Sequence, residues 1–220
     1  MNCPGCCPVR DVNNLNNTFD TNQARKDAQR YLKKGLDQRG RKLIAYLLTH
    51  CSEPLSVLDI GCGAGGVHHE LLRQGVASRA VGVDVSSAYL AAAQSNAAQL
   101  NLSDHVTYER QDFAQATETF APADVVIMDR VICCYPHLTQ LLGAAAQHSQ
   151  RYLSLSFPID AWWTRLPFRI FDVFQTLFRS KYRFYLHPQA EVITLIEAAG
   201  LRCVHSDRSS IWQIMVFARP

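Results

Sequence analysis

The sequence has neither a large net charge nor a long apolar run. The 220 residues carry a formal net charge of only +3, and no stretch of about 18 apolar residues is free of charge. We therefore expect no membrane-spanning helix, and so small a charge argues against a protein that coats nucleic acid. The 11 Gly and 9 Pro are too few for a fibrous or low-complexity chain, whereas 48% hydrophobic residues suit one folded domain.

The N-terminus lacks the apolar core of a secretion signal, which bears on how the eight cysteines are interpreted. Without secretion we expect a cytoplasmic protein with reduced thiols rather than a disulfide scaffold. Cys3, Cys6 and Cys7 lie in residues 1–20, which are rich in Asn and Pro and are predicted to be a flexible lead. Such thiols can bind zinc or copper, but no second ligand pair follows, so we predict no metal site. The other five cysteines are expected to pack as small hydrophobic residues.

A basic segment follows the lead. Residues 21–50 are predicted to be a helix, and the part that ends at Lys42 has eight Lys or Arg residues against two Asp. We favour a solvated helical face that covers the entrance to the core. The alternative is an electropositive lip for an anionic substrate.

Beyond this segment, short apolar strands alternate with helices to the end of the chain. Such alternation predicts right-handed βαβ units and an α/β fold with a doubly wound, mostly parallel sheet, helices on both faces and a C-terminal antiparallel hairpin. Residues 21–220 are therefore expected to form a single domain, whose ligands bind at the carboxyl ends of the strands. The expected strands are 56–60, 80–84, 106–109, 123–129, 152–157, 201–206 and 211–218, and the expected helices are 67–74, 86–100, 137–148 and 188–199.

The first of these strands ends in a glycine-rich loop. Gly61–Gly66 follows the pattern Gly-x-Gly-x-x-Gly of dinucleotide-binding loops, which by itself is weak evidence. Asp59, two residues before the loop, would repel a pyrophosphate but can accept a hydrogen bond from an ammonium group. Asp84 ends the second strand, where a carboxylate can bind both ribose hydroxyls, and Asp112 follows the third, where it can reach an adenine amino group.

Together these residues resemble the class I S-adenosylmethionine-dependent methyltransferases. Val57–Gly65 is similar to the glycine motif of the family, Val83–Asp84 to its ribose-binding acid and Gln111–Phe113 to its adenine motif. The resemblance covers residues 43–220 and implies a Rossmann-like, seven-stranded sheet. It also implies S-adenosylmethionine as cofactor and in-line methyl transfer, in which alignment contributes most of the catalysis and no general base is obligatory.

The resemblance further implies which residues contact the cofactor. The glycine loop and Asp59 would face the methionine end, Asp84 the ribose, and Asp112 with Phe113 the adenine. The implied cofactor-binding set is Asp59, Gly61, Cys62, Gly63, Gly65, Asp84, Val85, Asp112, Phe113 and Asp129.

The segment after the fourth strand, Met128–His137, is expected to line the acceptor pocket. It lacks the Asn/Asp-Pro-Pro-aromatic sequence of many enzymes that methylate DNA or protein amino groups, and it is loosely similar to the magnesium-protoporphyrin O-methyltransferases. We therefore expect a small-molecule acceptor, prefer O-methylation, and regard nucleic acid as a poor candidate. Arg130 can pair with an acceptor carboxylate. Tyr135 and His137 can position or deprotonate a nucleophile, or only cap and pack the following helix.

Residues 157–187 are unusually rich in aromatic and basic residues. They can form a lid that packs over the pocket, an apolar acceptor site with arginines for carboxylates, or a peripheral membrane helix. Two further functional classes stay open. A NAD(P)-dependent oxidoreductase would share the glycine loop and Asp84, and a non-catalytic cofactor-binding or membrane-associated protein would share the fold.

Overall fold

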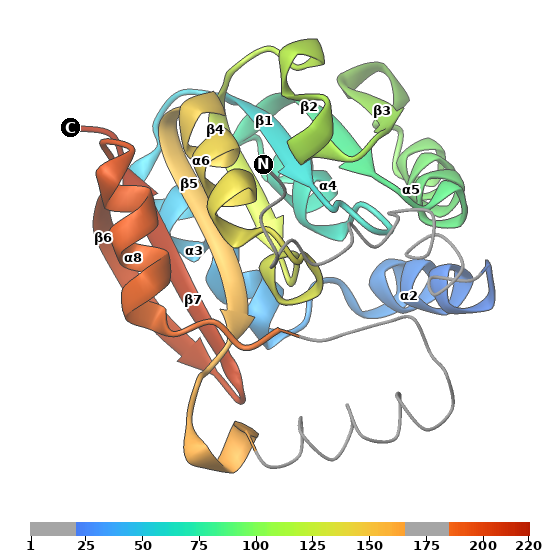
Figure 1. Cartoon of the computed structure of the whole chain (residues 1–220). Helices are drawn as coiled ribbons and strands as arrows, with labels where there is room; N and C mark the ends of the chain where they lie inside the picture. Colours follow the sequence, from blue (N-terminus) through green and yellow to red (C-terminus); the bar gives the residue numbers. More distant parts are fainter. Residues whose placement is uncertain (1–20, 166–184) are drawn as a thin grey trace, which may run out of the picture.

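The computed structural model describes residues 21–165 and 185–220 (Figure 1). The predicted lead, 1–20, and most of the predicted lid, 166–184, lie outside the described residues. Within the described part, no helix has both the length and the apolar character that a membrane span needs.

Seven strands form one sheet in the order β3-β2-β1-β4-β5-β7-β6. The first five strands along the chain are parallel, and β7 pairs antiparallel with both β5 and β6. This topology confirms the predicted Rossmann-like sheet with its C-terminal hairpin. The strands are β1 (Leu55–Ile60), β2 (Ala77–Asp84), β3 (Val106–Arg110), β4 (Ala123–Asp129), β5 (Ser149–Pro158), β6 (Arg202–Ser209) and β7 (Trp212–Ala218).

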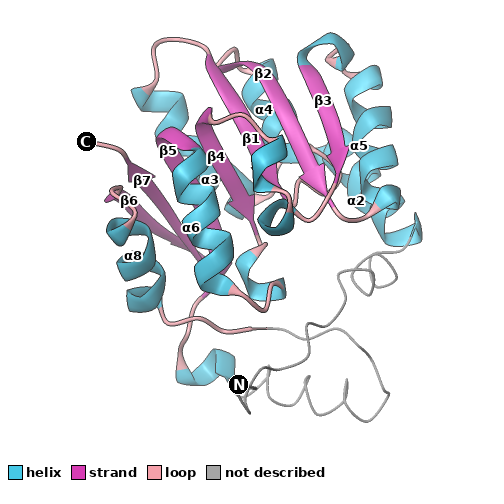
Figure 2. Cartoon of the chain, turned by 45° about the horizontal axis from the view of Figure 1, so that its top comes forward, coloured by secondary structure: helices cyan, strands magenta, loops and turns pink. Residues whose placement is uncertain are grey.

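Helices cover both faces of the sheet, which therefore has two apolar cores (Figure 2). One core packs α6 and α8 against alternate strand residues such as Val126 and Met128, and the other packs α3, α4 and α5 against Val125 and Ile127. The two-residue period of a strand explains this division. The helices are α2 (Thr21–Lys34), α3 (Gln38–His50), α4 (Gly66–Arg73), α5 (Ser87–Gln99), α6 (Leu138–His148) and α8 (Gln189–Ala198), with short 3₁₀ helices η1 (Ser103–His105), η2 (Phe113–Gln115), η3 (Thr117–Thr119) and η4 (Ile132–Cys134).

The single basic helix predicted for residues 21–50 is wrong, because the structure contains two helices there. Gly35 ends α2 in the left-handed region, with φ of +67°, and its N–H donates to the Tyr31 carbonyl over 2.7 Å. Asp37 then caps α3 by accepting a hydrogen bond from the Gly40 N–H at 2.8 Å. As a result α2 packs against α5, whereas α3 packs against β5, β6 and β7. The break thus places two basic helices over different parts of the sheet.

We predict opposite stability effects for alanine at two glycines. Gly35→Ala should lower the free energy of unfolding by about 1 kcal/mol, because an L-residue is strained at φ of +67°. Gly143→Ala, inside α6, should raise it by roughly 0.5–1 kcal/mol through helix propensity. An added Cβ meets no atom within 4 Å at either site, so packing does not obscure the comparison. Urea titrations measure both changes, and stabilisation by Gly35→Ala would contradict this account of the break.

Candidate active site

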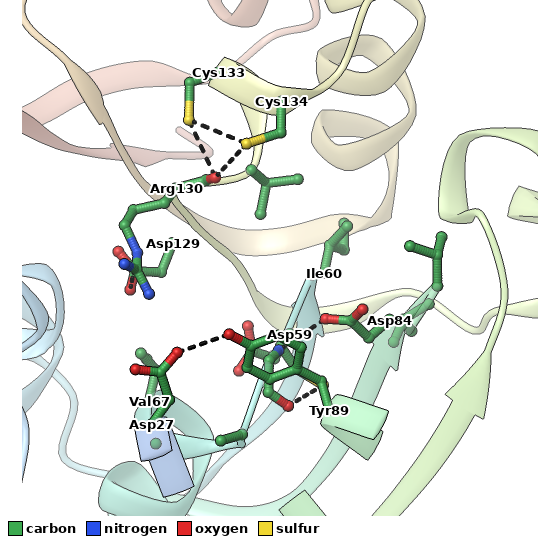
Figure 3. Close-up of a pocket in the computed structure, with 18 of the residues that line it drawn as sticks. Asp27, Asp59, Ile60, Val67, Asp84, Tyr89, Asp129, Arg130, Cys133 and Cys134 are labelled. Carbon is green, nitrogen blue, oxygen red and sulfur yellow. Dashed lines mark hydrogen bonds and ion pairs between the residues drawn. The ribbon is translucent and has the colours of Figure 1, made fainter. Parts of the chain in front are cut away.

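A cavity of about 480 Å³ opens at the carboxyl ends of the central strands, the place expected for a ligand in this topology. Its walls come from the glycine loop after β1, the ends of β2 and β4, the residues after β3, η4, and the two basic helices. The sequence predicted that the basic segment covers the entrance to the core, and in the structure α2 and the start of α3 form one wall of the cavity. Asp27 of α2 accepts a hydrogen bond from the Tyr89 hydroxyl at 2.7 Å across the cavity (Figure 3).

The glycine loop owes its shape to close contacts with its neighbours. The N–H groups of Gly61 and Cys62 both donate to the Val83 carbonyl, at 2.7 and 3.0 Å. A Cβ at Gly61 would lie 2.6 Å from a methyl carbon of Val131, and one at Gly65 would lie 2.4 Å from Cε1 of His69. Gly61, Cys62 and Gly63 line the cavity, whereas Gly65 is not part of its wall. The structure therefore assigns Gly65 to making room for a histidine ring, a role that the glycine pattern did not reveal.

Asp84, the predicted ribose-binding acid, ends β2 in the cavity wall beside Val85. Its carboxylate accepts hydrogen bonds from the Gly63 N–H at 2.9 Å and the Ser86 N–H at 2.8 Å. Burial raises the pKa of Asp84 in spite of these backbone donors. The carboxylate is thus oriented by neutral groups and has no cationic side chain as its partner in these bonds.

Asp112 and Tyr135, predicted for different roles, are hydrogen-bonded to each other. The Tyr135 hydroxyl lies 3.1 Å from both carboxylate oxygens of Asp112, and the Ala114 N–H donates to Oδ1 over the same distance. Burial raises the pKa of Asp112 and raises that of Tyr135 to about 12. Tyr135 therefore stays protonated near neutral pH and is a poor base, and its position is beside the predicted adenine acid and buried Phe113.

His137, the other candidate base, is exposed and is not among the residues of the cavity wall. It precedes α6, makes no capping hydrogen bond through its side chain, and contacts the Tyr135 ring edge-on at 6.3 Å between ring centres. The structure thus places His137 outside the wall of the cavity, which contains all the other predicted site residues except Gly65.

Asp129, at the end of β4, is held by a buried arginine from α3. Arg39 donates to both carboxylate oxygens of Asp129 at 2.8 Å, and the Ser156 hydroxyl donates to one of them at 2.5 Å. Although burial favours a raised pKa, Arg39 keeps the pKa of Asp129 below its ordinary value. Arg39 itself is only 8% exposed and lies over the Trp212 ring. The favoured interpretation of the basic segment as a solvated face is therefore wrong for this residue.

Arg130 follows in the left-handed backbone region, with φ of +63°. Its N–H donates to Oγ of Ser156 at 3.1 Å, and its carbonyl accepts hydrogen bonds from the thiols of Cys133 and Cys134 at 3.2 and 3.7 Å (Figure 3). The side chain lines the cavity and is 46% exposed, with a long contact of 3.9 Å to Asp129. Of the three predicted catalytic residues, Arg130 is the one whose charged group remains available to a ligand.

Both ends of the predicted lid are attached to described parts of the chain. Near its start, the Ile159 N–H donates to the Ile211 carbonyl over 2.8 Å. At its end, the Tyr185 N–H donates to the Cys133 carbonyl over 2.7 Å, and the His187 ring lies 3.1 Å from the Ile132 carbonyl. The segment therefore returns to η4, in the wall of the cavity. Trp162 and Trp163 near its start are 77% and 52% exposed.

Asp59 is almost fully buried at the end of β1 and has a partner that sequence reasoning missed. One carboxylate oxygen lies 2.8 Å from Nδ1 of His68, in the first turn of α4. Burial raises the pKa of Asp59, and the charge of Asp129 adds to this effect. The sequence contains one indication of this pair, two adjacent histidines placed where a helix packs against the sheet.

The acids of the cavity wall differ in whether their partners are neutral or cationic. Six carboxylates face three arginines. Asp59, Asp84 and Asp112 are held by neutral donors and have raised pKa values, whereas Asp129 is paired with Arg39 and has a lowered one. The cavity therefore suits a ligand with hydroxyl or cationic donor groups better than a polyanion. In the described segments, no group of three or more His, Cys, Asp or Glu side chains is arranged to hold a metal ion.

The comparisons with known proteins indicate a family. A family model described as a methyltransferase domain matches residues 52–179. The sequence matches none of the curated proteins. Magnesium protoporphyrin IX methyltransferase from Synechocystis, solved with SAH bound, has a similar structure, with 21% identity and a TM-score of 0.76 over 96% of this chain and 100% of its own.

Two further methyltransferase structures have the same fold. An O-methyltransferase family protein from Burkholderia thailandensis is 15% identical over 92% of this chain and 61% of its own, with a TM-score of 0.70. The 1,6-didemethyltoxoflavin-N1-methyltransferase of the same bacterium is 17% identical over 100% of this chain and 93% of its own, with a TM-score of 0.68. At these identities the similarity shows the fold alone.

We predict that Arg39→Leu lowers the free energy of unfolding by about 3–5 kcal/mol at pH 7, because Asp129 is left buried without its cation. In the wild type the lowered pKa of Asp129 stabilises the fold above the unfolded value of about 3.9, and this stabilisation is lost as the pH falls through the lowered value. In the variant, burial raises the pKa, so stability should decrease as the pH rises. Denaturant titrations at several pH values test this reversal.

The exposed Arg79→Leu serves as the control and should change stability by no more than about 0.5 kcal/mol. If Arg39→Leu lowers the free energy of unfolding by the same amount at every pH, lost packing and not the charge of Asp129 is responsible.

Proposed function

The chain belongs to the methyltransferase domain family, and from this premise we propose that the cavity binds S-adenosylmethionine together with a small-molecule methyl acceptor. The family match covers more than half of the chain and favours a methyltransferase over an oxidoreductase or a non-catalytic protein. The observation that carries the proposal is the set of acids with neutral donors in the cavity wall, which suits a ligand with an ammonium group, hydroxyl groups and an amino group.

The residues of the cavity fit the parts of this cofactor. Asp84 would accept hydrogen bonds from the ribose hydroxyls, Asp112 beside Phe113 would accept one from the adenine amino group, and Asp59 would face the methionine ammonium group. Gly61–Gly63 and Val85 would complete this part of the wall. We assign Asp129 and Gly65 to support of the site. The carboxylate of Asp129 is already paired with Arg39, and the His69 ring fills the space where a side chain of Gly65 would lie.

When bound, S-adenosylmethionine supplies a methyl group on a sulfonium sulfur that is already activated for in-line displacement. The chain then has to orient the acceptor and exclude water, and alignment of this kind contributes several kcal/mol. Arg130 is suited to orient an acceptor carboxylate, because its guanidinium lines the cavity and its backbone is fixed by Ser156, Cys133 and Cys134. A carboxylate is ionised near neutral pH and needs no base, in keeping with a protonated Tyr135 and a His137 outside the cavity.

These points favour O-methylation of a carboxylate-bearing small molecule, and nitrogen, carbon and sulfur acceptors are the alternatives. The magnesium protoporphyrin IX methyltransferase of Synechocystis shares the fold and is named for a small-molecule acceptor. The predicted lid would enclose an apolar part of the acceptor, since it returns to η4 in the cavity wall. Its exposed Trp162 and Trp163 equally suit contact with a membrane surface.

We predict that Asp84→Ala weakens binding of S-adenosylhomocysteine by at least about 100-fold, because two charge-assisted hydrogen bonds to the ribose are lost. Isothermal titration calorimetry measures the affinity, and circular dichroism verifies the fold. Asp104→Ala changes an exposed acid in η1 and should bind like the wild type. Wild-type affinity in Asp84→Ala would show that the ribose is not bound there, and NADH binding instead of S-adenosylhomocysteine would support the oxidoreductase.

We predict that methyl transfer to an acceptor from a cell extract gives an alkali-labile product. A methyl ester releases volatile methanol in base, whereas an N-methyl group or an aryl ether keeps its label. The measurement follows the radioactive methyl group of S-adenosylmethionine before and after alkaline treatment. Arg130→Ala should reduce transfer by about 10-fold or more, because the carboxylate loses a charge-assisted partner, while Arg79→Ala should not. An alkali-stable product would contradict the carboxylate acceptor and leave methyl transfer itself intact.

A further inference from the structure

A buried chain of hydrogen-bonding side chains lies behind the glycine loop. Nδ1 of His68 is 2.8 Å from Asp59, its Nε2 is 3.2 Å from the Tyr108 hydroxyl, and that hydroxyl is 2.6 Å from Nε2 of His69. Both histidines are 0% exposed and Asp59 is 1% exposed. The proposed methyl transfer uses Asp59 and gives no reason for the other three residues.

The surrounding backbone provides space for these rings. A Cβ at Gly65 would lie 2.4 Å from Cε1 of His69, and a Cβ at Gly82 would lie 2.9 Å from the Tyr108 ring. Any side chain at either glycine would therefore displace a member of the chain. Two glycines on different elements thus fit the same set of rings, which indicates a built arrangement rather than incidental packing.

The hydrogen positions can be assigned by counting donors. Burial lowers the pKa of His68 to about 3 and that of His69 to about 2, so both rings are neutral near pH 7. Nδ1 of His69 is buried and has no hydrogen-bond partner in the described residues. If this nitrogen carries no hydrogen, His69 donates to Tyr108, Tyr108 donates to His68, and His68 donates to an ionised Asp59.

The opposite direction is less favourable. It requires a protonated Asp59 and leaves an N–H of His69 buried without an acceptor, and such orphan donors are rare. The Tyr108 hydroxyl can instead donate to the Ala93 carbonyl at 3.3 Å and accept from both histidines, but Nδ1 of His68 then needs a protonated Asp59 as its donor. With Asp59 ionised, His68 donates to it and every donor of the chain has an acceptor.

We propose that His68 is a positioning residue which, supported by Tyr108 and His69, keeps Asp59 ionised and aimed at the ammonium group of the cofactor's methionine end. This proposal rests on the proposed function, because it concerns the same cavity. His68 acts through Asp59 and does not itself line the cavity.

Other charged groups around Asp59 make such support necessary. Asp129 on β4 raises the pKa of Asp59, although its own charge is paired with Arg39 of α3. Asp84 on β2 and the Cys62 thiol in the glycine loop also interact with Asp59, and neither is a cation. Without the His68 donor, the pKa of Asp59 would rise further, and the protonated form attracts an ammonium group less strongly.

The test compares two replacements of His68 by calorimetry with S-adenosylhomocysteine between pH 6 and 9. His68→Leu removes the donor to Asp59, so affinity at pH 7 should fall by about 10- to 100-fold and recover as the pH rises and Asp59 ionises. His68→Asn keeps a donor near the position of Nδ1, so its affinity should stay within about threefold of the wild type. The exposed His105→Asn is the control.

A second readout needs no cofactor. The ¹³C chemical shift of the Asp59 carboxyl carbon should report an ionised group at pH 7 in the wild type and in His68→Asn, and a protonated one in His68→Leu. If His68→Leu does not fold, Tyr108→Phe takes its place in this measurement, because it removes only a hydroxyl. It should raise the pH at which Asp59 titrates. Equal affinities and equal Asp59 titration in all variants would overturn the role of His68. Absence of S-adenosylhomocysteine binding in the wild type, with Asp59 shifts as expected, would instead overturn the proposed function alone.

Discussion

The buried ion pair between Arg39 and Asp129 links the parts of this structure that the cavity requires. It joins α3 to the end of β4 through two bonds of 2.8 Å, although the residues are 90 positions apart. Because α2 is connected to α3 by a turn of a few residues, the pair also fixes the wall that α2 contributes. It neutralises Asp129, which otherwise would add a second full charge next to Asp59. A buried pair of this kind adds little net stability, but breaking it is costly, so its main effect is on position.

With Asp129 neutralised, the other acids can keep their charge for a ligand. Asp59, Asp84 and Asp112 are held by an imidazole, by backbone N–H groups and by a tyrosine hydroxyl, respectively. Neutral donors orient a carboxylate without cancelling its charge, and each oxygen can accept more than one hydrogen bond. The raised pKa values of these three acids reflect the cost of burying a carboxylate without a cationic partner. A cationic ligand would offset that cost, which is why the arrangement suits a sulfonium cofactor better than a pyrophosphate.

The sequence predicted the sheet and placed a glycine loop and acids at the strand ends that line the cavity, because these signals are local. Apolar strands, a glycine loop and acids at strand ends are adjacent in the chain, and the topology gathers strand ends at one edge. The partners of those acids depend on contacts between distant elements. Nothing local in Tyr135 indicates that it bonds Asp112, 23 positions away, and nothing in Arg39 indicates burial. The end of α2 was predictable, since Gly35 and the capping Asp37 are ordinary helix boundary residues, but the continuous basic charge obscured them.

The same distinction applies to the proposed division of the cavity into a cofactor half and an acceptor half. The cofactor half is built from strand ends, where a changed side chain disturbs the sheet register or the glycine loop. The acceptor half is built from Arg130, η4 and α2, and its backbone is held by bonds that do not depend on the groups facing the cavity. The Arg130 N–H donates to Ser156. The Ile132 carbonyl accepts a hydrogen bond from the His187 ring, and the Cys133 carbonyl accepts one from the Tyr185 N–H. Side chains on this frame can change without loss of fold, and Arg130, which lines the cavity 3.9 Å from Asp129, is the charged group that we propose to orient the acceptor.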